Sequence, residues 1–302
     1  MMKVIFLTKQ LFILLFVTLF SAACGSQKTG SMSNVVPAQA LDGYQAHALS
    51  VISPKGSSDT PVKIEIVPGK NMEVDCNHYS LMGGFSEKVL SDGNSYYLFE
   101  SDGQATSTLM ACPDNTKRKE FVRGQSIFFD LNEALPPVVF ASEGIEIRER
   151  LWNSTSPYTI EKGVNVTIET EATQALKAYP ESLEGYDRYV LFLPEIKNSM
   201  KDRKVEIIPG VTTEVDCNKH GLMGEFVEKN IEGWGYNYLV FESDGGVRST
   251  RMGCPDNTRH TELVTGATHL MNYNSRLPVV IFIPKKDNFS VQYRIWEAGD
   301  LK

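Results

Sequence analysis

Short stretches in which apolar and polar residues alternate recur along most of the chain. In the first half they lie at Ile64–Val67, Tyr96–Phe99, Val138–Phe140 and Ile145–Trp152. Each is rich in β-branched and aromatic residues, and turn signals such as Pro68-Gly69 separate them, as is typical of strands. No window holds a sustained helical period with caps. The pattern predicts an all-β protein.

The pattern of the first half returns in the second half. Lys63–Cys76 reappears as Lys204–Cys217 at an offset of 141 residues, and Ser107–Thr116 reappears as Ser249–Thr258 at an offset of 142 residues. Solenoid repeats are about 20–50 residues long, so a period of this length indicates two duplicated domains.

Domain boundaries follow from the limits of the repeat. We predict two tandem antiparallel β-sandwich or barrel domains at residues 41–153 and 178–302, each large enough to bury its own core. An inter-domain segment, residues 154–177, joins them and is rich in Ser, Thr and Glu. Its middle part, Val164–Glu169, alternates like a strand.

The first 23 residues have the pattern of an export signal. Lys3 and Lys9 precede an apolar run from Leu11 to Phe20, and small residues follow at 21–23. The run is too short to span a bilayer, which needs about 20 apolar residues. We predict a signal peptide over residues 1–23.

Cys24 follows the predicted cleavage site and precedes a polar stretch. The arrangement resembles a bacterial lipoprotein signal, although Ser21 stands where such signals usually carry Leu. We predict that Cys24 is lipidated and that residues 24–40 form a tether to the outer membrane, in the periplasm or at the cell surface. The alternative is ordinary cleavage after Ala23, which would leave a free thiol.

The net charge narrows the choice of partners. The formal charge of the 302 residues is −7, and removal of Lys3 and Lys9 with the signal peptide lowers it to −9. Nucleic-acid binding requires clustered cations that neutralise phosphates, and no block of Lys and Arg is present. We therefore expect no nucleic-acid partner.

The remaining four cysteines divide evenly between the two copies. Cys76 and Cys112 are 36 residues apart, and Cys217 and Cys254 are 37 residues apart. These spacings differ from the C-x-x-C pattern of zinc and redox sites, so we expect no metal. In an exported protein they predict one disulfide per domain.

The segment before the second cysteine of each pair combines small β-forming residues with one large side chain. That side chain is Leu109 in the first copy and Arg251 in the second, inside otherwise similar segments. A buried slot that accepts Leu would reject a cation, so the pattern favours a rigid loop that offers this residue outward. The alternative is an exposed strand position without a role.

Several motifs, in order and with both cysteines, resemble the ecotin family of periplasmic inhibitors of chymotrypsin-fold serine proteases. They are Val-Asp-Cys-Asn, Glu-Gly-Trp-Gly-Tyr, Ser-Thr-x-Met-x-Cys-Pro, Tyr-Asn-Ser-x-Leu-Pro and a terminal Tyr-Arg-x-Trp. The second copy matches from about Ala178 to Trp296 and the first from about Gly43 to Trp152. The chain resembles a tandem, lipoprotein form of this family.

The resemblance implies that one loop of each copy enters a protease active site as a substrate would. Leu109 and Arg251 would then fill the primary specificity pocket, Leu109 in elastase-like or chymotrypsin-like proteases and Arg251 in trypsin-like ones. The reactive-loop residues are Ser107, Thr108, Leu109, Met110, Ser249, Thr250, Arg251 and Met252.

The resemblance also implies two further groups of residues. A loop that supports the reactive loop would contain Asn77, His78, Tyr79, Asn218, Lys219 and His220. A secondary protease contact in the second copy would contain Trp234, Gly235, Tyr236, Asn272, Tyr273 and Asn274. In the first copy, residues 92–95 lack the Trp and Phe128–Leu131 replaces the partner loop, so the resemblance carries this contact to the second copy only.

Ecotins dimerise through the C-terminal strand, which corresponds here to Ile145–Trp152 and Phe289–Trp296. The resemblance therefore implies that the two copies pair within the chain as a pseudo-dimer, rather than as a homodimer of two chains. Alternation alone would equally describe two ordinary core strands.

Two other classes of function remain to be weighed. The chain has no H-E-x-x-H, no G-x-S-x-G and no Gly-rich phosphate loop, so we expect neither an enzyme nor a cofactor. A non-inhibitory surface adhesin or ligand-binding β-sandwich lipoprotein is the alternative, because this architecture hosts many functions.

Overall fold

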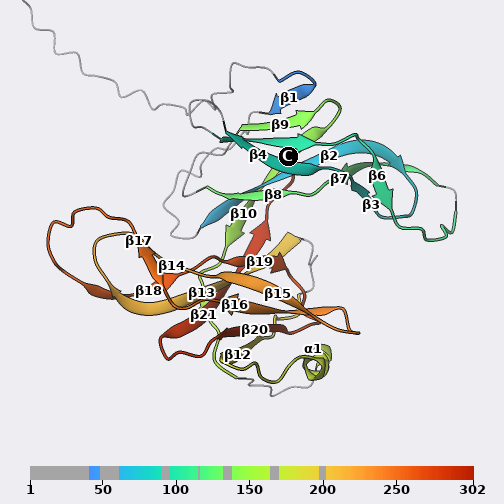
Figure 1. Ribbon diagram of the computed structural model, residues 1–302. Coiled ribbons are helices and arrows are strands. Elements are labelled where there is room, and N and C mark those ends of the chain that lie inside the picture. Colours follow the sequence, from blue (N-terminus) through green and yellow to red (C-terminus); the bar gives the residue numbers. More distant parts are fainter. Residues whose placement is uncertain are drawn as a thin grey trace, which may run out of the picture. The chain divides into compact units, whose positions relative to one another are not determined.

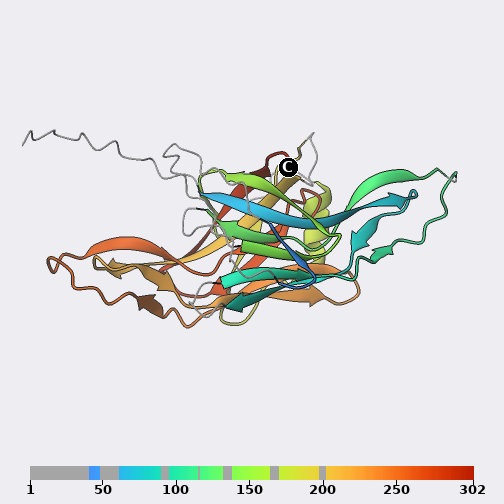
Figure 2. The same ribbon diagram turned by 90° about the horizontal axis from the view of Figure 1, so that it is seen from above.

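The structure is a computed structural model, and it describes residues 41–47, 61–89, 95–114, 116–131, 138–163, 170–196 and 202–302 (Figures 1 and 2). The predicted signal peptide, the whole of the predicted tether (residues 24–40, with Cys24) and the predicted strand at Val164–Glu169 lie outside the described residues. Among the described residues, no helix has the length and apolar character needed to cross a membrane.

Strands dominate the described part of the first half. They are β1 (Tyr44–His47), β2 (Val62–Val74), β3 (Tyr79–Leu81), β4 (Gly84–Val89), β5 (Ser95–Glu100), β6 (Ala105–Ser107), β7 (Arg118–Arg123), β8 (Ile127–Asp130), β9 (Val138–Ser142) and β10 (Glu146–Ser154). The short strand β11 (Tyr158–Thr159) follows them.

The second half repeats this order after α1 (Glu171–Ala175) and the 3₁₀ helix η1 (Leu176–Ala178). Its strands are β12 (Tyr186–Leu191), β13 (Arg203–Val215), β14 (His220–Leu222), β15 (Glu225–Ile231), β16 (Tyr236–Glu242), β17 (Val247–Ser249), β18 (His260–Thr265), β19 (His269–Asn272), β20 (Val279–Pro284) and β21 (Phe289–Ala298). The prediction of two tandem β domains is confirmed.

Each half contributes a four-stranded sheet and part of a shared nine-stranded sheet. The four-stranded sheets have the orders β1-β9-β5-β4 and β12-β20-β16-β15, and the main path of the large sheet is β18-β13-β21-β10-β2-β7. Most neighbouring strands are antiparallel, as predicted. The exceptions are β5 with β9 and β16 with β20, which run parallel because long connections bring the later strand back beside the earlier one.

The long strands β2 and β13 carry the core of each half. Ile66 and Val205 are fully buried, and so are Phe99 and Phe241 from the facing four-stranded sheets. Because flanking strands and a second sheet cover β2 and β13, residues 64–69 and 205–211 are continuously buried, including Glu65 and Glu206. Burial of such side chains stabilises each half by about 1.5–3 kcal/mol per residue.

The short helix α1 lies in the inter-domain segment and was not expected. Thr170 and Thr173 form its capping box, in which each side chain accepts a hydrogen bond from the backbone N–H of the other residue. Five residues are too few to produce a helical period, so sequence periodicity could not reveal it. After η1, Tyr179 packs on Tyr236 with stacked rings 5.9 Å apart.

The C-terminal strands of the two halves, β10 and β21, pair with each other over a short length. Most of β10 pairs with β2, and most of β21 pairs with β13. Only Trp152–Ser154 pairs with Trp296–Ala298. β11 then continues along β21, opposite Tyr293 and Gln292.

Candidate functional site

The loop predicted to be reactive in the first half, residues 107–110, continues directly from a small two-stranded ribbon. β3 and β6 pair from Tyr79 opposite Ser107 to Leu81 opposite Ala105. The ladder extends by one residue, because Thr108 N–H donates to the His78 carbonyl at 3.0 Å. In return, His78 N–H donates to Thr108 Oγ1 at 3.1 Å, so the backbone enters the loop in an extended, held conformation.

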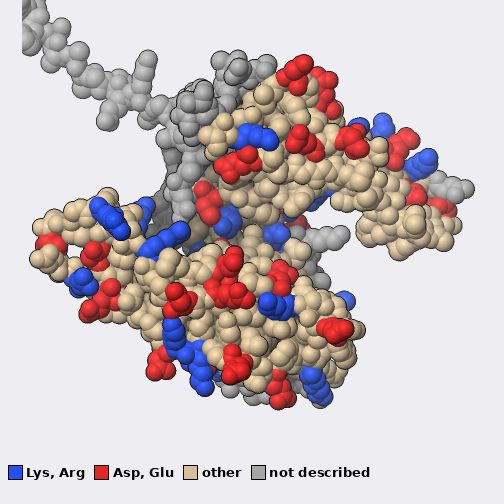
Figure 3. Space-filling model, viewed as in Figure 1, with Lys and Arg blue, Asp and Glu red and all other residues tan. Residues whose placement is uncertain are grey.

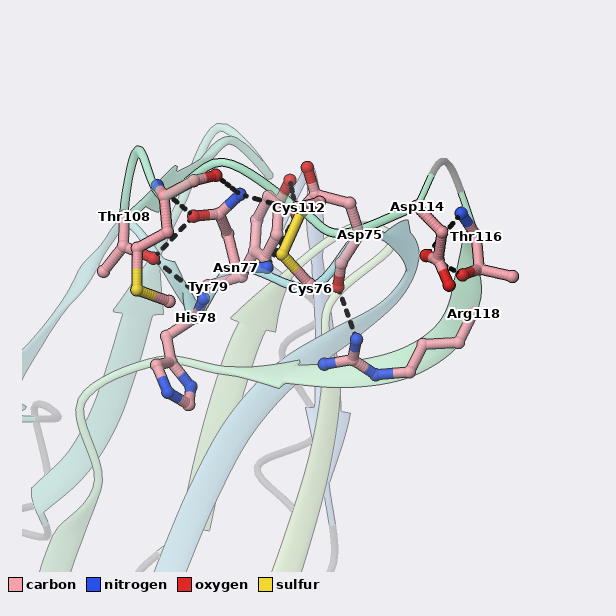
Figure 4. Close-up of a disulfide and its surroundings, with 11 residues drawn as sticks. Asp75, Cys76, Asn77, His78, Tyr79, Thr108, Cys112, Asp114, Thr116 and Arg118 are labelled. Carbon is pink, nitrogen blue, oxygen red and sulfur yellow. Dashed lines mark hydrogen bonds between the residues drawn. A yellow bond between two sulfur atoms is a disulfide. The ribbon is translucent and has the colours of Figure 1, made fainter.

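Asn77 holds the residues on both sides of Leu109. Its Oδ1 accepts hydrogen bonds from Thr108 Oγ1 at 2.9 Å and from Met110 N–H at 2.7 Å. Its Nδ2 donates to the Met110 carbonyl at 3.2 Å, and Figure 4 shows the side chain directed into the loop. One buried amide therefore fixes the loop before and after Leu109.

Asp75 places Asn77 in this position. Asp75 Oδ1 accepts from Asn77 N–H at 2.8 Å and from the Tyr79 hydroxyl at 3.2 Å. The bond from Asn77 N–H holds the pKa of this carboxyl below its usual value. Arg118 donates to the Asp75 carbonyl, which ties the segment to β7 (Figure 4).

The predicted disulfides are both present. Cys76 and Cys112 are bonded with Cα atoms 5.6 Å apart, and Cys217 and Cys254 with Cα atoms 5.7 Å apart. Within the described residues, Asp75, Cys76 and Cys112 form the one cluster of possible metal ligands. Since the two sulfurs are bonded to each other, the cluster offers no thiolate.

The second half reproduces the same arrangement. Asn218 Oδ1 accepts from Thr250 Oγ1 at 2.9 Å and from Met252 N–H at 2.8 Å, and Nδ2 donates to the Met252 carbonyl at 3.4 Å. His220 replaces Tyr79, with Nδ1 2.8 Å from the Asn218 carbonyl and Nε2 3.5 Å from Asp216 Oδ1. The Asn218 N–H bond holds the pKa of Asp216 below its usual value.

The side chains between these anchors face solvent. Leu109 is 98% exposed, which excludes a role in the core. Its exposed fraction is larger than that of any other large apolar residue among the described ones. Arg251 is also exposed, and Met110 and Met252 are 53% and 60% exposed. In each half, therefore, one solvent-exposed side chain stands on a loop whose backbone is fixed by hydrogen bonds to a buried or half-buried asparagine.

The residues of the expected secondary contact differ in exposure. Trp234 is 61% exposed, its ring lies 5.9 Å from that of Tyr236, and Gly235 (φ +66°) permits the turn between them. Asn272 is exposed and accepts from Lys204 Nζ at 3.0 Å, and Asn274 Oδ1 accepts from Arg276 N–H.

Tyr273 does not fulfil the expectation of a protease contact. Its side chain is 4% exposed, and its hydroxyl donates to the Pro194 carbonyl at 2.6 Å. Because the ring belongs to the core of the second half, it supports the loop from inside and cannot offer a surface.

Sequence reasoning missed Asp75 and Asp216 as parts of the site. Both stand in the Val-Asp-Cys-Asn motif of their copy, so the repeat contained a signal for them. Their contribution became visible only in the bonds to the backbone of Asn77 and Asn218.

Comparisons of the sequence with known proteins identify its relatives. A family model described as Ecotin matches residues 37–154 and again residues 175–298. The Ecotin of Serratia proteamaculans (strain 568) is 37% identical over 150 residues, which are 49% of this chain and 86% of that protein. The Ecotin of Pseudomonas fluorescens (strain Pf-5) is 46% identical over 125 residues, which are 40% of this chain and 77% of that protein.

These relatives align over most of their own length but over less than half of this chain, as one copy against two would. The family model covers both halves and most of the chain. The chain therefore belongs to the ecotin family, whose members inhibit serine proteases and are not enzymes.

Proposed function

We propose that each half of the chain inhibits chymotrypsin-fold serine proteases by inserting its reactive loop as a substrate mimic. The proposal rests mainly on Leu109. Its side chain is 98% exposed, whereas the residues before and after it are fixed by hydrogen bonds to Asn77. An extended loop adds to the protease backbone as a strand, and its rigidity lowers the entropy lost on binding.

The hydrogen bonds of Asn77 bear directly on the bond that a protease would attack. With Leu109 in the primary pocket, the scissile bond is Leu109–Met110, and Met110 N is the leaving nitrogen. That nitrogen donates to Asn77 Oδ1, and Cys112 ties the following segment to Cys76. After cleavage the leaving amine stays beside the new carboxyl end, so resealing of the bond competes with hydrolysis.

The pocket residue sets the target of each loop. Arg251 matches an acidic pocket, as in trypsin, because a guanidinium forms charge-assisted bonds to a carboxylate. Leu109 matches the apolar pockets of elastase-like and chymotrypsin-like proteases, since it would leave a pocket carboxylate unpaired. The exposed Trp234 and Asn272, with the half-buried Tyr236, supply a second contact.

A titration tests this function. The purified chain is added in increasing amounts to trypsin and, separately, to elastase, and the residual activity is measured. We expect a stoichiometric loss of both activities. No loss at micromolar protein would contradict inhibition and favour a non-inhibitory adhesin.

Leu109→Ala should weaken inhibition of elastase and leave inhibition of trypsin unchanged. Removal of the leucine side chain from an apolar pocket costs about 2–3 kcal/mol, a loss of about 30-fold to 150-fold in affinity. The inhibition constant for elastase is measured in an Arg251→Ala background, and the inhibition constant for trypsin is measured in the chain that keeps Arg251. Met82→Ala, which removes another exposed apolar side chain of the first half, is the matched control. An unchanged elastase constant would refute the assignment.

Asn218→Ala should convert the second loop from an inhibitor towards a substrate. The variant loses three hydrogen bonds, to Thr250 Oγ1, Met252 N and Met252 O, so the loop must be ordered when the protease binds. We expect about 30-fold weaker trypsin inhibition and faster cleavage after Arg251, followed by mass spectrometry. Asn288→Ala, an exposed asparagine in another turn, is the control. Equal cleavage rates in both variants would contradict the role of Asn218.

We further propose that the two halves form an internal pseudo-dimer. Beyond the ladder between β10 and β21, Lys63 Nζ lies 3.6 Å from Glu206 Oε1 and 5.0 Å from the centre of the Trp296 ring. The equivalent Lys204 lies 5.8 Å from the centre of the Trp152 ring. These reciprocal contacts support a twofold-like pairing of the copies.

The segments that follow β10 and β21 extend this pairing. After β10, Ile160 N–H donates to the Val291 carbonyl at 2.9 Å, and after β21, Lys302 N–H donates to the Glu149 carbonyl at 2.9 Å. Each tail therefore covers part of the other half's C-terminal strand. With these edges occupied, β10 and β21 offer little backbone to a second copy.

The protein should accordingly remain a monomer on dilution and on concentration. The linked halves have an effective mutual concentration that can reach millimolar, so the pairing persists where a homodimer would dissociate. Light scattering of the chain without its first 24 residues should show one constant mass from nanomolar to micromolar protein. A mass that doubles with concentration would refute internal pairing.

Ecotin homologues are periplasmic, and we propose that lipidated Cys24 holds this one at the outer membrane. Several acyl chains on one cysteine would anchor the inhibitor firmly, where proteases from outside arrive. Mass spectrometry of the N-terminal peptide distinguishes an acylated Cys24 from a free thiol.

A further inference from the structure

The second reactive loop differs from the first in charge at more than the pocket position. At three equivalent positions the second half has a cation and the first half has none that is permanently charged. The pairs are His78 and Lys219, Thr106 and Arg248, and Leu109 and Arg251. Lys219, Arg248 and Arg251 are all exposed, and none of them forms an ion pair with another described residue.

Arg248 lies across the ribbon that supports the loop. It stands opposite Gly221 in the pairing of β14 with β17. A Cβ atom at Gly221 would lie 3.4 Å from Arg248 Nε and 3.8 Å from its Cγ, so the side chain runs directly over this glycine. In the first half, Ser80 stands opposite Thr106. The second half therefore places the large side chain opposite a glycine, and a Cβ atom there would be in ordinary van der Waals contact with it.

Lys219 lies beside the residue that precedes Arg251. Its carbonyl accepts from Thr250 N–H at 3.0 Å, and its N–H donates to Thr250 Oγ1 at 3.1 Å. Arg248 precedes Arg251 by three residues, which is about 10 Å along an extended strand. Three unpaired cations thus gather along one loop of a chain whose formal net charge is −7.

The fold does not require these charges. Exposed cations without a partner contribute little to stability, and the first half builds the same ribbon without them. On the face shown in Figure 3, acidic and basic side chains are interspersed. Exposed cations beside a binding residue act on an incoming partner.

We propose that Arg248 and Lys219 are specificity-determining residues of the second loop. They select serine proteases that combine an acidic primary pocket with acidic side chains along the part of the cleft that binds the residues before the cleaved bond. This inference rests on the inhibitory function proposed above. The attraction raises the association rate, and salt weakens it because the Debye length is only about 10 Å at 0.1 M.

Anionic and cationic trypsin provide the test, because they share the primary pocket and differ in surface charge. Association rate constants are measured by stopped flow at low and at high salt with the full chain and with an Arg248→Thr, Lys219→His double variant. We expect the double variant to associate about tenfold more slowly with anionic trypsin at low salt. Cationic trypsin should change by less than about twofold, and the salt dependence with anionic trypsin should flatten.

A matched control removes the same charge elsewhere. Lys177 and Lys285 are exposed residues of the second half outside the loop, and Lys177→Thr with Lys285→Thr lowers the net charge equally. If this control slows association as much as the loop variant does, the effect belongs to the total charge and the proposal is wrong. If neither trypsin is inhibited by the unmodified chain, the proposed function itself fails.

A gain of function excludes misfolding as the cause. In an Arg251→Ala background, Leu109→Arg creates a trypsin-directed first loop. Addition of Ser80→Gly and Thr106→Arg should then raise its association rate with anionic trypsin by about threefold to tenfold at low salt. An association rate that stays the same after Ser80→Gly and Thr106→Arg would contradict the proposal that a cation at the position of Arg248 determines specificity.

Discussion

An Arg251→Ala variant should lose nearly all of its trypsin inhibition. In the proposed complex the guanidinium pairs with a carboxylate at the base of the protease pocket, and the truncation leaves that carboxylate buried without a partner. Such central contacts are worth at least 2 kcal/mol and often about 4 kcal/mol, so the inhibition constant should rise by up to about 1000-fold. A Leu109→Ala background removes any contribution of the first loop.

The control is Arg123→Ala, which removes another exposed arginine that lies on β7, at the edge of the large sheet. It should inhibit trypsin as the unmodified chain does. If trypsin affinity is unchanged in the Arg251→Ala, Leu109→Ala double variant, neither exposed residue fills the pocket.

Replacement of Cys217 and Cys254 by alanine should have the second large effect. The disulfide closes a loop with a sequence separation of 37 residues, and loss of such a link lowers the free energy of unfolding by about 3–4 kcal/mol. It also frees the segment after the scissile bond, so trypsin should cleave between Arg251 and Met252 and release its product. Urea unfolding measures the first effect, and mass spectrometry of the cleaved chain measures the second.

The equivalent replacement in the first half provides the comparison. Cys76→Ala with Cys112→Ala should destabilise its own half by a similar amount and leave trypsin inhibition by Arg251 intact. Lasting trypsin inhibition without the Cys217–Cys254 bond would contradict the proposal that the disulfide holds the leaving segment.

Internal repetition was the strongest source of correct prediction. It divided the chain into two halves, assigned Cys76 to Cys112 and Cys217 to Cys254, and drew attention to Leu109 and Arg251 as the position where similar loops diverge. Two copies of one fold act as their own alignment, because a polar or charged residue that replaces an apolar one at an equivalent position indicates an exposed site, as at Leu109 and Arg251.

Local sequence rules failed where the outcome depends on distant neighbours. Helix α1 is too short for a period, and the parallel pairing of β5 with β9 depends on how a long connection returns. Tyr273 matches a surface motif, yet it is buried. Its hydroxyl donates to the Pro194 carbonyl, and its ring packs in the core of the second half.

The sequence by itself determined the strands, the two-domain organisation, the disulfides and the two exposed residues that differ between the loops. Only the tertiary structure decided that Asn77 and Asn218 hold those loops by hydrogen bonds, and that Arg248 lies across the ribbon from Gly221. The physical reason is the separation along the sequence of the residues that interact. Strand patterns and cysteine pairs follow from composition along the chain, whereas a hydrogen bond across 33 residues exists only when folding brings both atoms within about 3 Å.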